Sequence, residues 1–308
     1  MLIVIAIGGN MISDASNKTE TFEQQLSRVN STAELISKII QMGHDVVITH
    51  GNGPQVGSLL LQQEEGIDGT IKLPLSVLTA CTQGLIGVML QHALSNQFRN
   101  DGIEKNVLII PATMIVDKSD PAFSNPTKPV GPYFNITDLY ESGLKSDGKY
   151  QEFPQGYRKV VPSPIPTDIL ELPIIDSLLQ QGTVVITAGG GGTPTVLEGN
   201  RLQRIDGVID KDLASALLAR KIDADILVIL TNVDGVYLNY GRPSQQLLPH
   251  LTAEDGLKLI ENGDVMKGSM APKVLAAINF SSQGKSIITS PDCVLEALEG
   301  KAGTVIHE

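Results

Sequence analysis

Three short apolar runs in this chain each lead into a glycine-rich turn. The turns are Gly8-Gly9-Asn10 after residues 2–7, His50-Gly51-Asn52-Gly53 after residues 46–49, and Gly189 to Gly192 after residues 184–187. Apolar, β-branched runs without alternation are typical of strands buried on both faces, as in a parallel sheet. Helical patterns separate these runs. The sequence therefore predicts an α/β fold, a three-layer αβα sandwich with a largely parallel central sheet.

Glycine after a buried strand allows backbone N–H groups to approach a ligand closely. A following helix N-terminus adds partial positive charge, and ligands of open α/β sheets bind beyond the carboxyl ends of the strands. Three such turns predict an anion site, most simply for phosphate. The alternative is that all three are only tight turns.

Composition limits the class of partner. The 308 residues are 42% apolar and carry a formal charge of −11, which argues against a nucleic-acid partner because such binding needs clustered cations. Cys81 and Cys293 are too few and too far apart for a disulfide framework or a zinc site. No basic-then-apolar leader and no apolar stretch of ~18 residues is found. We expect a cytoplasmic enzyme that binds neither nucleic acid nor membrane.

Periodicity and capping signals predict the individual elements. Helices are expected at 20–42, 54–65, 74–97, 170–181 and 212–221, and strands at 107–110, 184–188 and 226–231. Later helices are expected to start near Thr252, which has Asp255 three residues on, and near Pro272 and Pro291.

The segment 117–168 breaks this pattern because it holds eight of the chain's 17 prolines. Proline removes a ladder donor and restricts the preceding residue, so this segment should lie outside the central sheet. A structureless loop of this length is improbable inside a compact domain. We expect a small protruding lid subdomain. A disordered linker is the alternative, although Phe123, Tyr133, Phe134 and Tyr157 offer apolar surface to bury.

Three lysines are candidates for phosphate chemistry. Lys211 and Lys273 lie at expected helix starts, where a cation opposes the helix dipole unless an anion binds there too. Lys128 precedes Pro129 in the expected lid. Each alone could be a solvated surface side chain. The P-loop pattern G-x-x-x-x-G-K-[ST] is absent, and Gly51, Gly53 and Gly57 form only a weak dinucleotide fingerprint.

These motifs together resemble the amino-acid kinase family, and most closely its members that phosphorylate carbamate. The resemblance is carried in order along nearly the whole chain by residues 6–10, 50–57, 125–132, 157–164, 189–192, 208–212, 268–270 and 272–273. It implies one domain over 1–308, with an acceptor lobe mainly in 1–200, a lid at 117–168 and a nucleotide lobe mainly in 201–308.

The resemblance also implies roles for individual residues. Lys128, Lys211 and Lys273 would gather negative charge, and Asp210 would orient the lysines unless it is only a helix N-cap. The expected phosphate and substrate contacts are Gly8, Gly9, Asn10, Gly51, Asn52, Gly53, Gly190 and Gly191. The expected nucleotide contacts are Thr231, Asp234, Tyr237, Tyr240, Gly268, Ser269 and Met270.

The implied reaction is reversible phosphoryl transfer between ATP and carbamate, in the direction of ATP synthesis from carbamoyl phosphate in arginine or purine breakdown. Mg²⁺ would arrive on ATP or ADP with few or no protein ligands, and a homodimer is implied. The stretch 152–156 lacks a glycine and an arginine usual in the family, and Met11 and residues 264–267 also depart from its pattern. A kinase of another small carboxylate or phosphonate, a non-catalytic sensor of carbamoyl phosphate or nucleotide, and a dinucleotide-dependent dehydrogenase are the alternatives.

Overall fold

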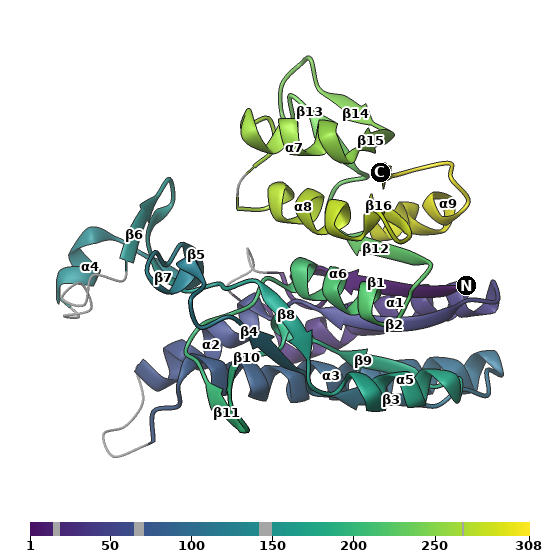
Figure 1. The fold of residues 1–308 in the computed structure, drawn as a ribbon, viewed down its shortest axis with the longest axis horizontal. Coiled ribbons are helices and arrows are strands. Elements are labelled where there is room, and N and C mark those ends of the chain that lie inside the picture. Colours follow the sequence, from purple (N-terminus) through teal and green to yellow (C-terminus); the bar gives the residue numbers. More distant parts are fainter. Residues whose placement is uncertain (15–18, 65–70, 142–149, 267) are drawn as a thin grey trace.

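The protein is described by a computed structural model that covers residues 1–14, 19–64, 71–141, 150–266 and 268–308 (Figure 1). An eight-stranded sheet forms its centre. Its strands in spatial order are β15 (His250–Thr252), β17 (Thr304–His307), β16 (Lys285–Thr289), β12 (Ile226–Leu230), β1 (Leu2–Ile7), β2 (Asp45–His50), β9 (Val184–Thr187) and β3 (Val107–Ile110). Neighbours from β16 to β3 are all parallel, and β17 is antiparallel to β16. The expected largely parallel sheet is confirmed.

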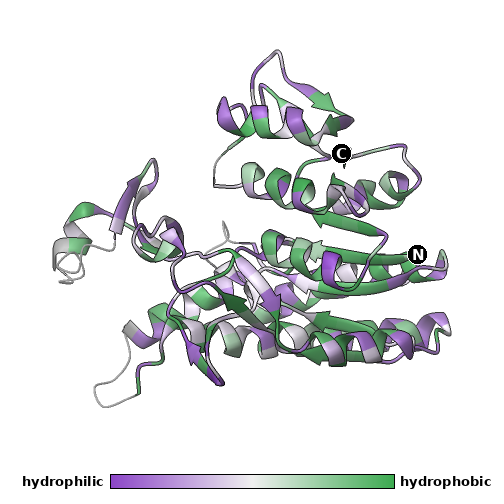
Figure 2. Cartoon of the chain, viewed as in Figure 1, coloured by the Kyte–Doolittle hydropathy of each residue, from purple (hydrophilic) through white to green (hydrophobic). Residues whose placement is uncertain are grey.

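Both faces of this sheet are buried, which explains the continuous apolar runs. In β1 the side chains of Ile3, Ile5 and Ile7 pack into one core, while Val4 and Ala6 pack into the other. All five are fully buried. Figure 2 shows the central strands as almost unbroken hydrophobic segments between helices of mixed character.

Helices cover each face and complete the expected three layers. One core contains side chains of α1 (Phe22–Gln41), α3 (Leu75–Asp101) and α9 (Val294–Leu298). The other contains side chains of α5 (Leu172–Gln180), α6 (Lys211–Lys221), α7 (Ala253–Glu261) and α8 (Met270–Ser281). The other helices among the described residues are α2 (Gly53–Glu64), α4 (Ile136–Glu141) and the short 3₁₀ turns η1 (Gly9–Met11), η2 (Pro121–Phe123), η4 (Gly189–Gly191) and η5 (Pro291–Cys293).

The expected helix boundaries hold to within a few residues, and their caps show why. Thr21 accepts a hydrogen bond from the backbone N–H of Gln24 and begins α1. Gly43, with φ +86°, follows the end of this helix. The Thr252 hydroxyl accepts from the N–H of Asp255 at 3.1 Å and begins α7 as expected.

Beyond the central sheet, the described residues form three further sheets that were not predicted from the sequence. A four-stranded sheet contains β11 (Arg201–Arg204), β10 (Thr193–Glu198), β4 (Thr113–Val116) and β8 (Pro166–Ile169). A two-stranded sheet pairs β13 (Val236–Leu238) with β14 (Gln246–Leu248). Strand β11 is fully exposed and β14 has only three residues, so these two lack the apolar runs that identify the central strands.

The proline-rich segment lies outside the eight-stranded sheet, as expected. Its middle forms a small sheet that stands apart from the body in Figure 1, with strands β5 (Lys128–Phe134), β7 (Gly156–Val161) and β6 (Tyr150–Phe153). Edge-to-face ring pairs join Tyr133 to Phe153 and Phe134 to Tyr150. The described residues of this segment thus form paired strands, as a small subdomain requires. The end of the segment forms β8 and belongs to the four-stranded sheet instead.

Helix α3 is long and apolar enough to cross a membrane by length and composition alone. More than half of its most apolar window is buried, and side chains such as Leu90, Leu94 and Phe98 lie in the core beside α1. Packing inside the protein therefore accounts for its composition.

Candidate active site

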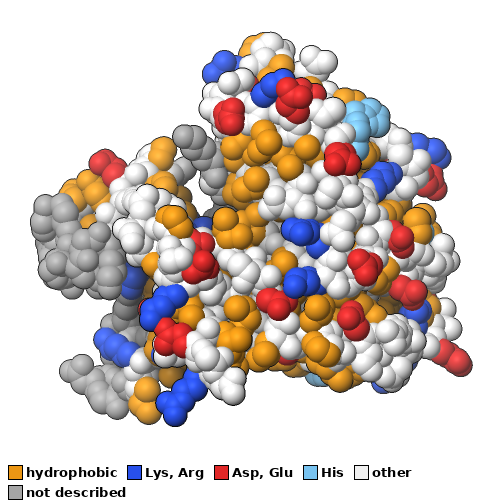
Figure 3. All heavy atoms as spheres, in the orientation of Figure 1, with side chains coloured by type: hydrophobic (Ala, Val, Ile, Leu, Met, Phe, Trp, Pro, Cys, Tyr) orange, Lys and Arg blue, Asp and Glu red, His pale blue; other side chains and the backbone are white. Residues whose placement is uncertain are grey.

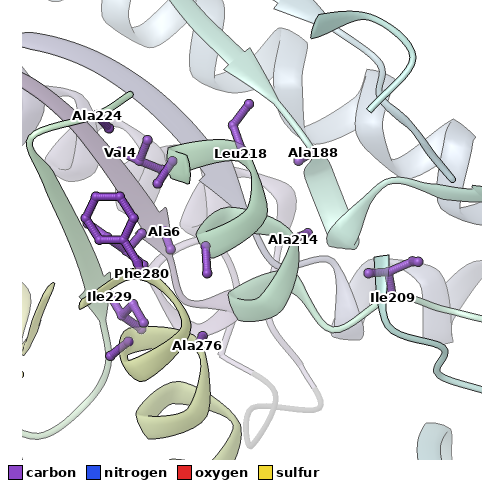
Figure 4. Packing of buried hydrophobic residues seen from close by; sticks show 14 of the residues in the cluster. Val4, Ala6, Ala188, Ile209, Ala214, Leu218, Ala224, Ile229, Ala276 and Phe280 are labelled. Carbon is purple, nitrogen blue, oxygen red and sulfur yellow. The ribbon is translucent and has the colours of Figure 1, made fainter. Parts of the chain in front are cut away.

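Strand β1 and helices α6 and α8 pack closely because small side chains separate them. Figure 4 shows Val4 and Ala6 of β1 in one cluster with Ala214 of α6 and with Ala276 and Phe280 of α8. Buried alanines allow the helix backbones to approach each other and the sheet. The N-termini of both helices are thereby held near the carboxyl end of β1, where the first glycine turn begins.

Two lysines at these helix starts converge on one carboxylate. Lys211 Nζ lies 2.7 Å from Asp212 Oδ1, an ion pair that is not aligned as a hydrogen bond, and donates to the carbonyl of Ala6 at 3.2 Å. Lys273 Nζ donates to Asp212 Oδ2 at 3.0 Å. The three side chains are almost entirely buried. This arrangement concentrates two cations against one anion at the end of the central sheet.

Burial and charge act in opposite directions on these groups. Burial raises the pKa of the Asp212 carboxyl, but Lys211 and then Lys273 outweigh it, so its pKa falls to about 2. Burial lowers the pKa of the Lys211 ammonium, and the nearby Lys273 lowers it further, while Asp212 offsets part of the change. The excess positive charge would favour an anion beside the lysines.

The third expected lysine comes from the small sheet. Lys128, the first residue of β5, donates to Asp210 Oδ2. Asp210 is also the N-cap of α6, because its Oδ1 accepts from the N–H of Asp212 at 2.9 Å. Asp210 therefore combines the two roles that the sequence offered as alternatives: it caps the helix and orients one lysine, whereas Asp212 orients the other two.

The structure brings most of the expected phosphate residues around one cavity of about 340 Å³. Its lining includes Gly9, Gly51, Asn52, Gly53, Lys128, Gly190, Asp210, Lys211, Asp212, Gly268, Ser269 and Lys273. Three expected residues do not line it. Gly8 and Gly191 pack against the carbonyls of Leu230 and Ile209, and Asn10 lines a neighbouring hollow between α1 and η5.

Gly191 permits a backbone approach that no other residue allows. Its φ is +85°, and a Cβ there would lie 2.3 Å from the carbonyl oxygen of Ile209. We expect Gly191→Ala to lower the free energy of unfolding by at least ~2 kcal/mol, measured by urea denaturation. Gly199→Ala is the matched control, since Gly199 also has positive φ but nothing within 4 Å, and should cost about 1 kcal/mol. Equal losses in the two variants would contradict this account.

His50 supports the second glycine turn as a neutral side chain. It is fully buried, and its Nδ1–H donates to the carbonyl of Gly51 at 2.9 Å. A Cβ at Gly189 would lie 2.4 Å from His50 Nε2, so the first glycine of the third turn packs directly on this ring. Burial is the main reason that the pKa of His50 falls to about 4. The hydrogen bond to Gly51 raises this pKa, and the positive charge of Lys211 lowers it further.

This pKa predicts an acid-sensitive stability. Above pH 6.5 His50 is neutral in both the folded and unfolded states; between pH 6.5 and 4 only the unfolded state gains its proton. Stability should therefore fall as pH drops through that window, by up to about 3 kcal/mol from this group. We expect His50→Gln to flatten the pH dependence of the urea midpoint there. Parallel curves for the two proteins would show that His50 is not responsible.

A second cavity of about 440 Å³ lies beside the lysine cluster, between β12, β13 and the start of α8. Of the expected nucleotide residues, Thr231, Tyr237, Tyr240, Ser269 and Met270 line it. Asp234 does not; its Oδ1 accepts from the Ser290 hydroxyl at 2.7 Å. The tilted rings of Tyr237 and Tyr240 lie 6.0 Å apart and offer flat apolar surface. Burial raises the pKa of the Tyr237 hydroxyl, as does Asp234, so it stays neutral.

The two cavities share a wall. Ser269 lines both. Gly268 lines the 340 Å³ cavity that contains the three lysines (the lysine cavity), and Met270 lines the 440 Å³ cavity (the nucleotide cavity). A molecule with a flat ring at one end and phosphates at the other would place its phosphates among the lysines. The arrangement can hold such a molecule and a second small anion together.

Sequence reasoning missed several contributors. Asp212 and Arg158 line the lysine cavity, and Ser215 links α6 to β2 by accepting from the Thr49 hydroxyl and donating to the carbonyl of Lys211. Asp212 was visible in the Asp210-Lys211-Asp212 string, but its role depends on where α6 begins. Arg158 lies in the 157–164 string that carries the family resemblance, but the resemblance gave it no role. Ser215 lies in a helix whose spacing carries no chemical signal.

The donor set does not suit a protein-held metal ion. Within the described ranges no three His, Cys, Asp or Glu side chains gather as possible ligands, and both aspartates of the cavity are paired with lysines. A divalent cation prefers free carboxylates and carbonyl oxygens.

Figure 3 shows acidic and basic side chains interspersed over the visible face, with no single basic patch.

The sequence and the fold were compared with those of known proteins. The model of the Amino acid kinase family matches residues 1–290. The chain belongs to the amino acid kinase family. This amino acid kinase is 45% identical to the carbamate kinase of Thermococcus kodakarensis and 44% identical to that of Pyrococcus furiosus, each over 99% of this chain and 98% of the relative. The solved carbamate kinase from Giardia lamblia bound to AMP-PNP superposes with a TM-score of 0.90 at 38% identity, over 99% of this chain and 98% of that one.

Proposed function

We propose that this amino acid kinase transfers a phosphoryl group reversibly between ATP and carbamate, and that it works as a carbamate kinase. The observation that carries the proposal is the lysine cavity, in which Lys128, Lys211 and Lys273 meet beside a nucleotide-sized cavity. Full-length similarity to carbamate kinases from two archaea supports it. The dehydrogenase alternative loses its support because the chain matches the Amino acid kinase family over residues 1–290 and is similar to carbamate kinases over its full length.

The chemistry requires positioning and charge neutralisation. In the ATP-forming direction a terminal β-phosphate oxygen of ADP attacks the phosphorus of carbamoyl phosphate. The P–O bond to the carbamoyl oxygen breaks, and carbamate leaves with that electron pair and then decomposes to ammonia and CO₂. Lys211 and Lys273 lie where they can neutralise the transferred oxygens, and Lys128 can approach from the small sheet. No group on the chain needs to accept a proton.

Mg²⁺ is proposed to enter as part of the nucleotide substrate. The cavity offers lysines where a resident ion would need carboxylates, so the ion would be held by phosphate oxygens and water. We assign nucleotide binding mainly to residues 201–308 and acceptor binding mainly to 1–200, because the larger ring-lined cavity is built after residue 230. The small sheet within 117–168 would act as the lid.

The test is an acceptor panel read in the ATP-forming direction. Purified protein with ADP and MgCl₂ is given carbamoyl phosphate or acetyl phosphate, and ATP is measured by luminescence. We expect kcat/KM to be at least tenfold higher with carbamoyl phosphate. An equal or higher value with acetyl phosphate would favour a kinase of another carboxylate. Binding of carbamoyl phosphate or nucleotide without any ATP would favour the sensor alternative.

The cellular setting is a separate part of the proposal. We propose a cytoplasmic homodimer that recovers ATP from carbamoyl phosphate, as in the arginine deiminase pathway or in purine breakdown. Support for these points comes from the resemblance to carbamate kinases alone. Light scattering of the purified protein would give the mass in solution, and a value near 32.9 kDa would exclude the dimer.

A further inference from the structure

Arg158 is a charged side chain of the lysine cavity that the proposed mechanism does not use. It lies on β7 of the small sheet and is partly buried. Its Nε–H donates to the carbonyl of Gly131 at 2.6 Å, and its guanidinium lies 5.1 Å from the centre of the Tyr133 ring. Among the described residues it has no carboxylate partner. One edge of the guanidinium is therefore anchored, while its other N–H donors are available to the cavity that the residue lines.

The anchor of Arg158 is fixed relative to the body. Gly131 adopts a φ of +72°, and a Cβ at Gly57 of α2 would lie 3.3 Å from Gly131 Cα. The backbones of α2 and β5 are thus in close contact where Arg158 is held. A planar guanidinium with a fixed Nε presents its remaining donors in a defined plane, which suits the two oxygens of a carboxyl group.

The place of Arg158 in the cavity indicates which of the two substrates, the nucleotide or the small acceptor, it would contact. The nucleotide cavity joins the lysine cavity through Ser269, beside Lys273 on α8. Arg158, Lys128 and Val130 come instead from the small sheet, and none of them lines the nucleotide cavity. Nucleotide phosphates entering past Ser269 would meet the helix lysines first. The carboxyl end of the acceptor would then face the small sheet.

We propose that Arg158 binds the carboxyl oxygens of the small acceptor and selects for a planar acid at this end of the cavity. The inference rests on the proposed function, whose acceptor it deepens. One guanidinium N–H donates to the acceptor oxygen that does not take part in phosphoryl transfer and a second donates to the oxygen that does, while the lysines hold the phosphoryl group. It holds the acceptor in line with the nucleotide, and no bond to Arg158 forms or breaks.

Arg158→Lys tests this inference because it keeps the charge but removes the fork and the Nε anchor. Binding of carbamoyl phosphate, inorganic phosphate and ADP is measured separately by calorimetry, without turnover. We expect the Kd for carbamoyl phosphate to rise at least tenfold, and those for inorganic phosphate and ADP to change less than twofold. Lys159→Gln is the matched control; the next residue of the strand does not line the cavity, and all three constants should stay unchanged.

Each other outcome overturns the inference. An unchanged Kd for carbamoyl phosphate would remove Arg158 from the acceptor site. Equal weakening of carbamoyl phosphate and inorganic phosphate would place it on the phosphoryl group instead. Weakening of all three ligands, or a lowered urea midpoint, would assign it a structural role only. Because these are binding measurements, they are independent of whether the wild-type protein forms ATP, which tests the proposed function by itself.

Discussion

Replacement of Lys211 by methionine is expected to lower kcat for ATP formation at least ~100-fold while the protein stays folded. Methionine keeps most of the buried volume of the side chain, so packing against β1 is preserved. The lost ammonium lies 3.2 Å from the Ala6 carbonyl and 2.7 Å from Asp212, at the meeting point of the first glycine turn and α6. A donor aimed at the transferred phosphoryl group loses its contribution mainly in the transition state. The measurement is kcat from coupled luminescence.

Lys221→Met is the control for this substitution. Lys221 is the last residue of the same helix and pairs with Asp168 at 2.9 Å on the surface. Its removal should leave kcat within twofold of the wild-type value, because an exposed ion pair contributes little. Near-normal turnover in Lys211→Met, with Lys221→Met as reference, would remove Lys211 from the reaction.

Asp212→Asn is expected to lower the free energy of unfolding by about 3 kcal/mol, because it leaves two buried lysines without their shared counter-ion. The carboxylate contacts Lys211 and Lys273 and is itself almost fully buried. Its pKa of about 2, below the ordinary 3.8, means that this stability is present above pH 3.8 and is lost as pH falls toward 2. Urea denaturation at pH 7 measures the loss. Turnover should fall as well, since both lysines lose their orientation.

Adding inorganic phosphate distinguishes the loss of the Asp212 charge from a loss of packing in this variant. Inorganic phosphate should raise the urea midpoint of Asp212→Asn more than that of the wild type, because it replaces the missing negative charge. Asp168→Asn removes the surface partner of Lys221 and should change stability by no more than about 0.5 kcal/mol, with no added response to phosphate. An equal phosphate response in all three proteins would contradict the role given to Asp212.

The central fold was predictable because its signals are local. The apolar runs at 2–7 and 184–187 are almost wholly buried on both faces. In the turns that follow them, a Cβ at Gly8, Gly191 or Gly192 would lie 3.1 Å or less from a neighbouring backbone carbonyl oxygen. The four-stranded sheet was not predictable. Its strand β11 reads Arg-Leu-Gln-Arg and is wholly exposed, so hydrophobic periodicity does not identify it.

The site was predictable in its lysines but not in their pairing. Lys211 and Lys273 conflict with the helix dipole, and that conflict indicates an anion from the sequence alone. Which carboxylate orients which lysine depends on the residue at which α6 begins. Asp210 stays extended as the N-cap and meets Lys128, while Asp212 enters the first turn and meets the other two. The position of Arg158 could not be predicted either, because it depends on the pairing of β5 with β7, which brings Arg158 close to Gly131.

Phosphorus NMR of the purified protein with carbamoyl phosphate, ADP and MgCl₂ tests the central claim most directly, because it follows donor and product phosphorus in one sample. The account predicts that the carbamoyl phosphate signal falls while the γ-phosphate signal of ATP rises by an equal amount, and that Lys211→Met shows neither change beyond spontaneous decay. If carbamoyl phosphate decays only to inorganic phosphate, at the same rate in both proteins, the lysine cavity does not transfer a phosphoryl group from carbamoyl phosphate to the nucleotide.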